Sequence, residues 1–210
     1  MYMKKTLFIA AIISLVTCQF SISQAQGRFD ASVFGGMNMC QIDGDGAGSY
    51  NHLGVRAGVG TSFSLTADIN SPWRMVVELA YTHKGSYIEA SDRTLMANYI
   101  EIPIMLSYNA LDNHLRIAGG VAPGILANAK VTSPGDVIDQ SSTDNFKRFD
   151  LLPLTASIRY RFGNHLGIEG RYQNSMLSIT KENATGTYRI WRDNKGAFSR
   201  LLTIGLFYQF

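Results

Sequence analysis

Seven charged side chains recur within otherwise small or apolar segments of the 210-residue chain: Arg56, Glu78, Glu101, Arg116, Arg159, Glu169 and Arg171. Carboxylates and guanidinium groups in a water-poor interior can serve acid–base catalysis, or they can pair with one another and stabilise a fold. Three acids and four bases, spread over many segments and not gathered in one motif, favour pairing. We therefore predict no catalytic residue and a structural network that fills the interior, in which the three glutamates pair with the four arginines.

Other residue types with possible chemistry give weaker patterns. Two histidines fall near one rim of the predicted fold and two near the other: His52, His83, His114 and His165. Each pair offers two ligands, whereas zinc sites use three or four protein ligands, so we predict no metal site. Ser86, His83 and Glu89 are the nearest approach to a hydrolytic set, but a strand would place them on different faces. The sequence has neither a phosphate-binding loop nor a G-x-S-x-G motif, and we expect no cofactor.

The segments that carry the seven charges alternate apolar and polar residues with a period of two, which is typical of β-strands. In residues 53–67, Leu, Val, Ala and Phe share one face, while Gly, Arg and Ser share the other. A tilted strand of about 9–11 residues crosses a bilayer, and this segment is longer. The same pattern predicts eight strands, at residues 28–39, 53–67, 73–86, 98–108, 114–127, 150–162, 166–177 and 198–210.

The connections between these predicted strands alternate in length. Long polar connections follow the first, third, fifth and seventh strands, at residues 40–52, 87–97, 128–149 and 178–197, and short turns follow the others. Short turns on one side and long loops on the other are typical of outer-membrane barrels, with the turns in the periplasm. We predict an all-β fold, an eight-stranded antiparallel up-and-down transmembrane β-barrel.

The two faces of the strands indicate which side meets lipid. The polar face sets its charges among Gly, Ala, Ser and Thr, which suits the narrow lumen of an eight-stranded barrel. The apolar face carries no charge, as lipid requires, since one Arg there costs about 2–4 kcal/mol at the bilayer midplane. Aromatic residues at the rim with the short turns predict an interfacial girdle: Phe29, Trp73, Tyr108, Tyr160, Phe162, Tyr208 and Phe210. A soluble lipocalin-type barrel, with its apolar face inside, is the alternative.

The amino-terminal segment has the features of a cleaved export signal. Lys4 and Lys5 precede an apolar run from Leu7 to Val16, and Ser23-Gln24-Ala25 fits signal peptidase. The run is shorter than the roughly 20 residues of a spanning helix. We predict a signal peptide at residues 1–25 and a barrel domain at residues 26–210. Without residues 1–25 the net charge falls from +3 to about +1, so we expect no nucleic-acid partner.

Several stretches resemble a known family, in order along nearly the whole remaining chain. They are ELAYTHKG (78–85), YIEIPIML (99–106), AGGVAPG (118–124), IRYRFGNHLGIEGRYQNSMLSI (158–179) and GLFYQF (205–210). Together they resemble the PorT-like outer-membrane β-barrel family. The resemblance implies a barrel in a Gram-negative envelope and supplies no catalytic residue. The member that names the family is associated with secretion and maturation of exported proteins, whereas most relatives have no assigned activity.

The sequence thus favours a non-enzymatic outer-membrane barrel that acts as an anchor, an adhesin or a component of envelope assembly or secretion. Its expected partners are outer-membrane lipids, the barrel-insertion machinery through the C-terminal strand, and a protein or glycan at the long loops. The cluster YRIWRDNK at residues 188–195 mixes aromatic and basic residues in one of these loops. The alternatives are the soluble lipocalin-type carrier of an apolar ligand and an outer-membrane enzyme that modifies lipids.

Overall fold

A computed structural model describes residues 29–43, 50–66, 68, 71–89, 92–133, 136–138, 146–151, 153–179, 187–188 and 195–210. The predicted signal peptide lies outside the described residues, as does most of the YRIWRDNK cluster. Within the described ranges, no helix is long and apolar enough to cross a membrane.

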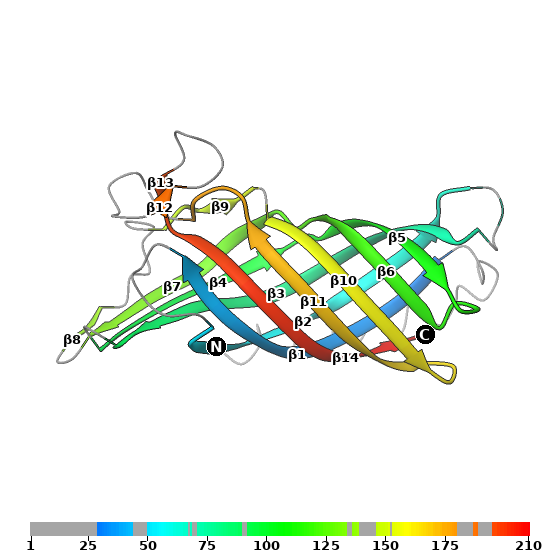
Figure 1. The fold of residues 1–210 in the computed structure, drawn as a ribbon, viewed down its shortest axis with the longest axis horizontal. Coiled ribbons are helices and arrows are strands. Elements are labelled where there is room, and N and C mark those ends of the chain that lie inside the picture. Colours follow the sequence, from blue (N-terminus) through cyan, green and yellow to red (C-terminus); the bar gives the residue numbers. More distant parts are fainter. Residues whose placement is uncertain are drawn as a thin grey trace, which may run out of the picture.

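The barrel wall is a closed ring of eight tilted strand segments, each of which we call a stave (Figure 1). Two of them consist of two strands each: β4 (Arg93–Glu101) with β5 (Ile104–Ala110), and β6 (Leu115–Val121) with β7 (Gly124–Ser133). The others are β1 (Phe29–Asp43), β2 (His52–Ser64), β3 (Trp73–Ile88), β10 (Pro153–Phe162), β11 (Leu166–Ser175) and β14 (Phe198–Gln209). Each stave pairs antiparallel with the next, and β1 pairs with β14 to close the ring. The predicted all-β, eight-stranded antiparallel fold is confirmed.

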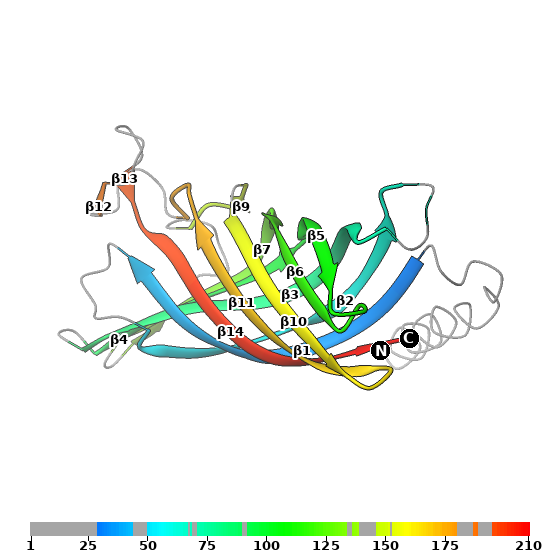
Figure 2. The same cartoon turned by 45° about the vertical axis from the view of Figure 1, so that its right-hand side comes forward.

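Short strands that the sequence did not predict lie at the end of the ring opposite the short turns (Figure 2). We call this end the loop rim, and the end that holds the short turns the turn rim. β8 (Asp136–Ile138) and β9 (Phe149–Asp150) both pair with β7. β12 (Thr187–Tyr188) and β13 (Lys195–Gly196) form a separate ribbon, in which Tyr188 faces Lys195.

Prolines break two of the predicted strands. The prediction of continuous strands at residues 98–108 and 114–127 is wrong at Pro103 and Pro123, because proline has no N–H to donate to a ladder. The carbonyls of Pro103, Pro123 and Pro153 each accept a backbone N–H from the preceding stave at 2.8 to 2.9 Å. The three prolines therefore lie in a row across neighbouring staves, and their carbonyls keep the sheet bonded at this level.

Side chains alternate between an apolar outer face and a charged interior. Val55, Ile158 and Ile204 point outward, with 54%, 52% and 64% of their surface exposed, whereas Arg56 and Arg159 point inward and are buried. This arrangement is the inverse of a soluble core, because the apolar surface is outside. The lipocalin-type alternative, with its apolar face lining the interior, is therefore wrong.

Glycines allow the first and last strands to approach closely. Gly36 and Gly205 are partners in the β1–β14 register. A Cβ atom at Gly36 would lie 2.5 Å from the carbonyl oxygen of Ile204, and one at Gly205 would lie 2.6 Å from that of Gly35. Any larger residue would push the closing strands apart.

Candidate functional site: a charged lumen beneath an apolar cap

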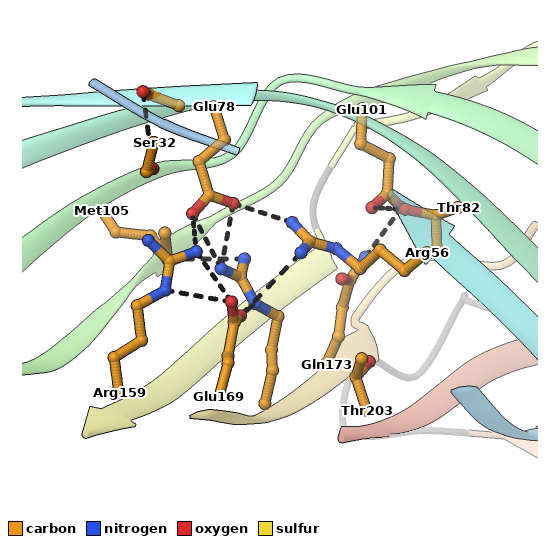
Figure 3. A network of polar contacts seen from close by, with 12 residues as sticks. Ser32, Arg56, Glu78, Thr82, Glu101, Met105, Arg159, Glu169, Gln173 and Thr203 are labelled. Atoms are coloured by element: carbon orange, nitrogen blue, oxygen red, sulfur yellow. Dashed lines mark hydrogen bonds and ion pairs between the residues drawn. The ribbon is translucent and has the colours of Figure 1, made fainter. Parts of the chain in front are cut away.

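Five of the seven predicted lumen charges meet at the centre of the barrel (Figure 3). Glu78 of β3 contacts three guanidinium groups, at 2.7 Å from Arg56, 2.7 Å from Arg159 and 2.9 Å from Arg171. Glu169 of β11 contacts the same three groups, at 2.7 Å from Arg159, 2.5 Å from Arg171 and 3.8 Å from Arg56. The network joins staves from opposite sides of the ring.

These central charges are stabilised because each one is paired. All five side chains are buried, and a buried charge is tolerated only with partners and satisfied hydrogen bonds. Three guanidinium groups face two carboxylates, which leaves one positive charge in excess. Aromatic rings lie against two of the guanidinium groups. The guanidinium of Arg56 lies 4.4 Å from the ring centroid of Phe34, and that of Arg159 lies 5.2 Å from the centroid of Phe207. Aromatic faces attract cations, most strongly where water is excluded.

Glu101 belongs to a second buried group, nearer the loop rim. Its carboxylate lies 2.8 Å from the ammonium of Lys84, which also lies 2.8 Å from Asp150. Thr82 and Gln173 donate hydrogen bonds to Glu101 at 2.8 and 2.7 Å (Figure 3). The prediction of an arginine partner for Glu101 is therefore wrong, because its ionic partner is Lys84.

Arg116 belongs to a third group, near the turn rim. Asp30 lies 3.4 Å from Arg116 and 3.1 Å from Arg74. Arg116 also donates to the amide oxygen of Asn109 at 2.9 Å. Arg116 thus pairs with an aspartate and not with the predicted glutamate.

Sequence reasoning missed four charged members of these groups: Asp30, Arg74, Lys84 and Asp150. For Arg74 a signal was present, because it lies four residues before Glu78 on the same strand and therefore on the same face. Asp150 is the first residue of a predicted strand, where the alternation of inward and outward side chains is a weak guide to the direction of a side chain.

An apolar cap covers the charges at the loop rim. Its buried residues come from the ends of β1, β4 and β7 and from the segments that connect the strands: Ile42, Ala97, Tyr99, Ala129, Phe146, Ile179 and Ala197. The backbone N–H of Lys147 donates to the carbonyl of Ile179 at 2.7 Å, and the N–H of Ile179 donates to Ala197 at 2.8 Å. Described parts of the long connections therefore fold back over the mouth. In the part of the chain that the structure describes, three charged groups and this cap fill the lumen from the turn rim to the loop rim.

The seven predicted girdle residues all lie at strand ends on the turn rim and are 40% to 66% exposed. Several form ring contacts with an aromatic neighbour. Trp73 and Tyr108 lie 5.1 Å apart, Tyr160 and Phe162 6.0 Å, and Tyr208 and Phe210 5.2 Å, while Phe29 lies 5.9 Å from Phe63. Such a belt of outward aromatic rings suits the interface between hydrocarbon and water.

In the described part of the chain, the candidate hydrolytic residues Ser86 and His83 each contact other side chains. The buried hydroxyl of Ser86 donates to Asn51 at 3.2 Å, and the two ring nitrogens of His83 contact His52 and Asn98. Ser86 and His83 therefore do not form a nucleophile–base pair. Among the described residues, no group of three or more His, Cys, Asp or Glu side chains is placed to hold a metal ion.

Comparison with known proteins identifies the family. A family model described as "Outer membrane protein beta-barrel domain" matches residues 22–181. The chain belongs to this family. Its location is the outer membrane, and the lipids of that membrane surround its apolar face. No curated protein matches the sequence.

Solved outer-membrane barrels share the fold. The attachment invasion locus protein Ail of Yersinia pestis, in complex with the heparin analogue sucrose octasulfate, is 14% identical with a TM-score of 0.53. Ail without that ligand is 15% identical with a TM-score of 0.51, and both comparisons cover 87% of this chain and 99% of Ail. Neisserial surface protein A is 11% identical, covers 88% of this chain and 98% of its own, and has a TM-score of 0.47. At 14% and 15% identity, the likeness to Ail concerns the fold alone.

Proposed function

We propose that this outer-membrane barrel is a closed, non-enzymatic scaffold that presents its long loops at the cell surface as an anchor or adhesin. The filled lumen is the observation that carries the proposal. Its charged side chains bind one another, and the apolar cap lies over them at the loop rim. A barrel of eight strands has room for side chains and little else, so transport through it is disfavoured and the exposed loops remain for recognition.

The contacts of the candidate hydrolytic residues support a non-enzymatic role. A nucleophile needs a base within hydrogen-bond reach and donors for the developing charge. Ser86 instead donates to an amide oxygen, and His83 is bonded on both sides to other side chains.

The loop partner that we propose is a sulfated or otherwise anionic glycan. The YRIWRDNK cluster supplies Arg189, Arg192 and Lys195 next to aromatic residues, and guanidinium groups bind sulfate and phosphate well. The heparin analogue named with Ail makes this class of ligand a reasonable first choice.

A second candidate role is envelope assembly or secretion. It rests on the ordered resemblance to PorT-like barrels in the stretches quoted above. In this role the loops or the turn rim would meet other envelope proteins. In either role, we propose that the C-terminal strand engages the barrel-insertion machinery.

Two measurements test the scaffold proposal. Purified barrel in planar lipid bilayers is expected to give no unit conductance steps, and reproducible steps would overturn the closed lumen. Binding to a heparin column is expected to be lost in an Arg189→Ala/Arg192→Ala variant and kept in an Arg28→Ala/Arg161→Ala control, which also removes two positive charges. Equal retention of all three proteins would contradict the loop assignment.

Deletion followed by comparison of the outer-membrane and secreted proteomes separates the adhesin role from the secretion role, because only the secretion role changes the set of secreted proteins.

A further inference from the structure

The seam between β2 and β3 loses its backbone ladder before either strand ends. Their register runs from Ser64↔Arg74 to Arg56↔Thr82, yet β2 continues to His52 and β3 to Ile88. Beyond the ladder, side chains bridge the seam. The amide nitrogen of Asn38 donates to the carbonyl of Val55 at 3.2 Å and to that of His83 at 3.1 Å.

Two histidine rings lie in this part of the seam. The Nε2 atoms of His52 and His83 face each other at 3.0 Å, and the rings are stacked with centroids 5.2 Å apart. Glycines make room for both rings. A Cβ atom at Gly54 would lie 2.6 Å from Cδ2 of His83, and one at Gly85 would collide with Cδ2 of His52.

Neighbouring amides fix the tautomer of His83. The Nδ1 atom of His83 lies 2.6 Å from Oδ1 of Asn98, and the NH₂ group of Asn98 donates to Oδ1 of Asn128. The Asn98 oxygen therefore accepts a hydrogen bond from the Nδ1–H group of His83, which leaves on its Nε2 a lone pair that accepts a hydrogen bond from Nε2 of His52. Metal-ligating histidines are held in this way, with the other ring nitrogen donating to an oxygen.

The distance between the two Nε2 atoms fits adjacent positions on a metal with 90° bond angles. With metal–nitrogen bonds of about 2.0–2.1 Å, ligands at 90° are roughly 2.8–3.0 Å apart, whereas tetrahedral ligands are roughly 3.3–3.4 Å apart. The two Nε2 atoms share a hydrogen bond at 3.0 Å, and this separation is the one that the first geometry requires, which square-planar or tetragonal Cu²⁺ and Ni²⁺ prefer.

We propose that His52 and His83 form a two-nitrogen binding site for Cu²⁺, and more weakly for Ni²⁺, with water in the remaining positions. His52 then carries its proton on Nδ1, so both Nε2 atoms can bind. The ion links β2 to β3 where no backbone ladder does. Since only the folded barrel brings the two rings together, Cu²⁺ at 100 times its dissociation constant shifts the folding equilibrium about 100-fold toward the barrel.

The test uses the whole exported barrel without a histidine tag, refolded in detergent and titrated with Cu²⁺. We expect one tightly bound ion, with electron paramagnetic resonance splitting from two nitrogens and a higher temperature for loss of the folded gel band. A His114→Gln/His165→Gln control keeps this site, because those histidines lie at the opposite rim and each contacts a backbone carbonyl.

Variants at the seam decide the outcome. His52→Gln and His83→Gln should each lose the two-nitrogen signal. Asn98→Ala retains both ligands but frees the His83 ring, and it should bind about 10–100-fold more weakly. Equal Cu²⁺ binding by wild type and the His52→Gln/His83→Gln double variant would overturn the proposal, as would a wild-type spectrum without two-nitrogen splitting. If a histidine variant does not fold, the spectrum of wild type and the Asn98→Ala titration still decide.

Discussion

Replacing Glu78 with glutamine removes one negative charge from the centre of the lumen and keeps the size of the side chain. Three guanidinium groups at 2.7 to 2.9 Å lose their ionic partner and then face Glu169 alone. At an effective dielectric of about 20, each contact carries about 6 kcal/mol of Coulomb attraction. Desolvation of the carboxylate offsets most of this, and the amide oxygen still accepts hydrogen bonds. Removal of one partner from a buried ion pair costs about 3–5 kcal/mol, and we expect this loss in the free energy of unfolding.

Urea titration of the refolded barrel in lipid vesicles, followed by tryptophan fluorescence and by the shift of the folded band on an unheated gel, measures the loss. Asp112→Asn is the matched control, because it removes a carboxylate from an exposed turn and should change stability by less than about 0.5 kcal/mol. A Glu78→Gln/Arg56→Gln double variant restores the charge balance and should regain part of the loss. If Glu78→Gln unfolds at the same urea concentration as Asp112→Asn, the ion-pair account of the lumen is refuted.

Three further changes probe other parts of the barrel. Lys84→Met leaves two buried carboxylates without their cation and should cost about 3–5 kcal/mol in the same urea titration; an unchanged midpoint would contradict the second charge group. Gly120→Ala places a methyl group against the backbone carbonyl of the neighbouring strand, whereas Gly170→Ala points into open space, so only the first should reduce the refolded fraction on gels. Ile158→Arg puts a charge on the outer face near mid-strand and should lose about 2–4 kcal/mol, while Leu111→Arg on an exposed turn should lose about 0–1; equal losses would argue against a lipid-facing wall.

The alternation of residue types was enough to predict which side chains point inward. Arg56 and Glu78 each sit between apolar outward neighbours, and side chains on a strand alternate with a period of two. The breaks at Pro103 and Pro123 were also marked in the sequence, since proline inside a predicted central strand argues against continuity. Each of these two prolines therefore marks a strand end that the sequence already indicated.

The pairing partners could not be predicted, because they depend on the stagger of the strands around the ring. Glu101 meets Lys84 because β3 and β4 pair near the loop rim. Arg116 meets Asp30 across 86 residues of sequence. The contact between His52 and His83 likewise depends on where the β2–β3 ladder stops, which no local pattern encodes.

The seam between β1 and β14, which runs from Ser32↔Gln209 to Asp43↔Phe198, constrains how the protein can be made. A nascent chain that lacks its final strand would carry two open edges, each a row of amides and carbonyls that hydrocarbon cannot hydrogen-bond. A chain without β14 is therefore unstable in the bilayer, and insertion of the barrel into the membrane is all-or-none. Pairing of β1 with β14 is therefore the event that distinguishes a finished barrel from an unfinished one.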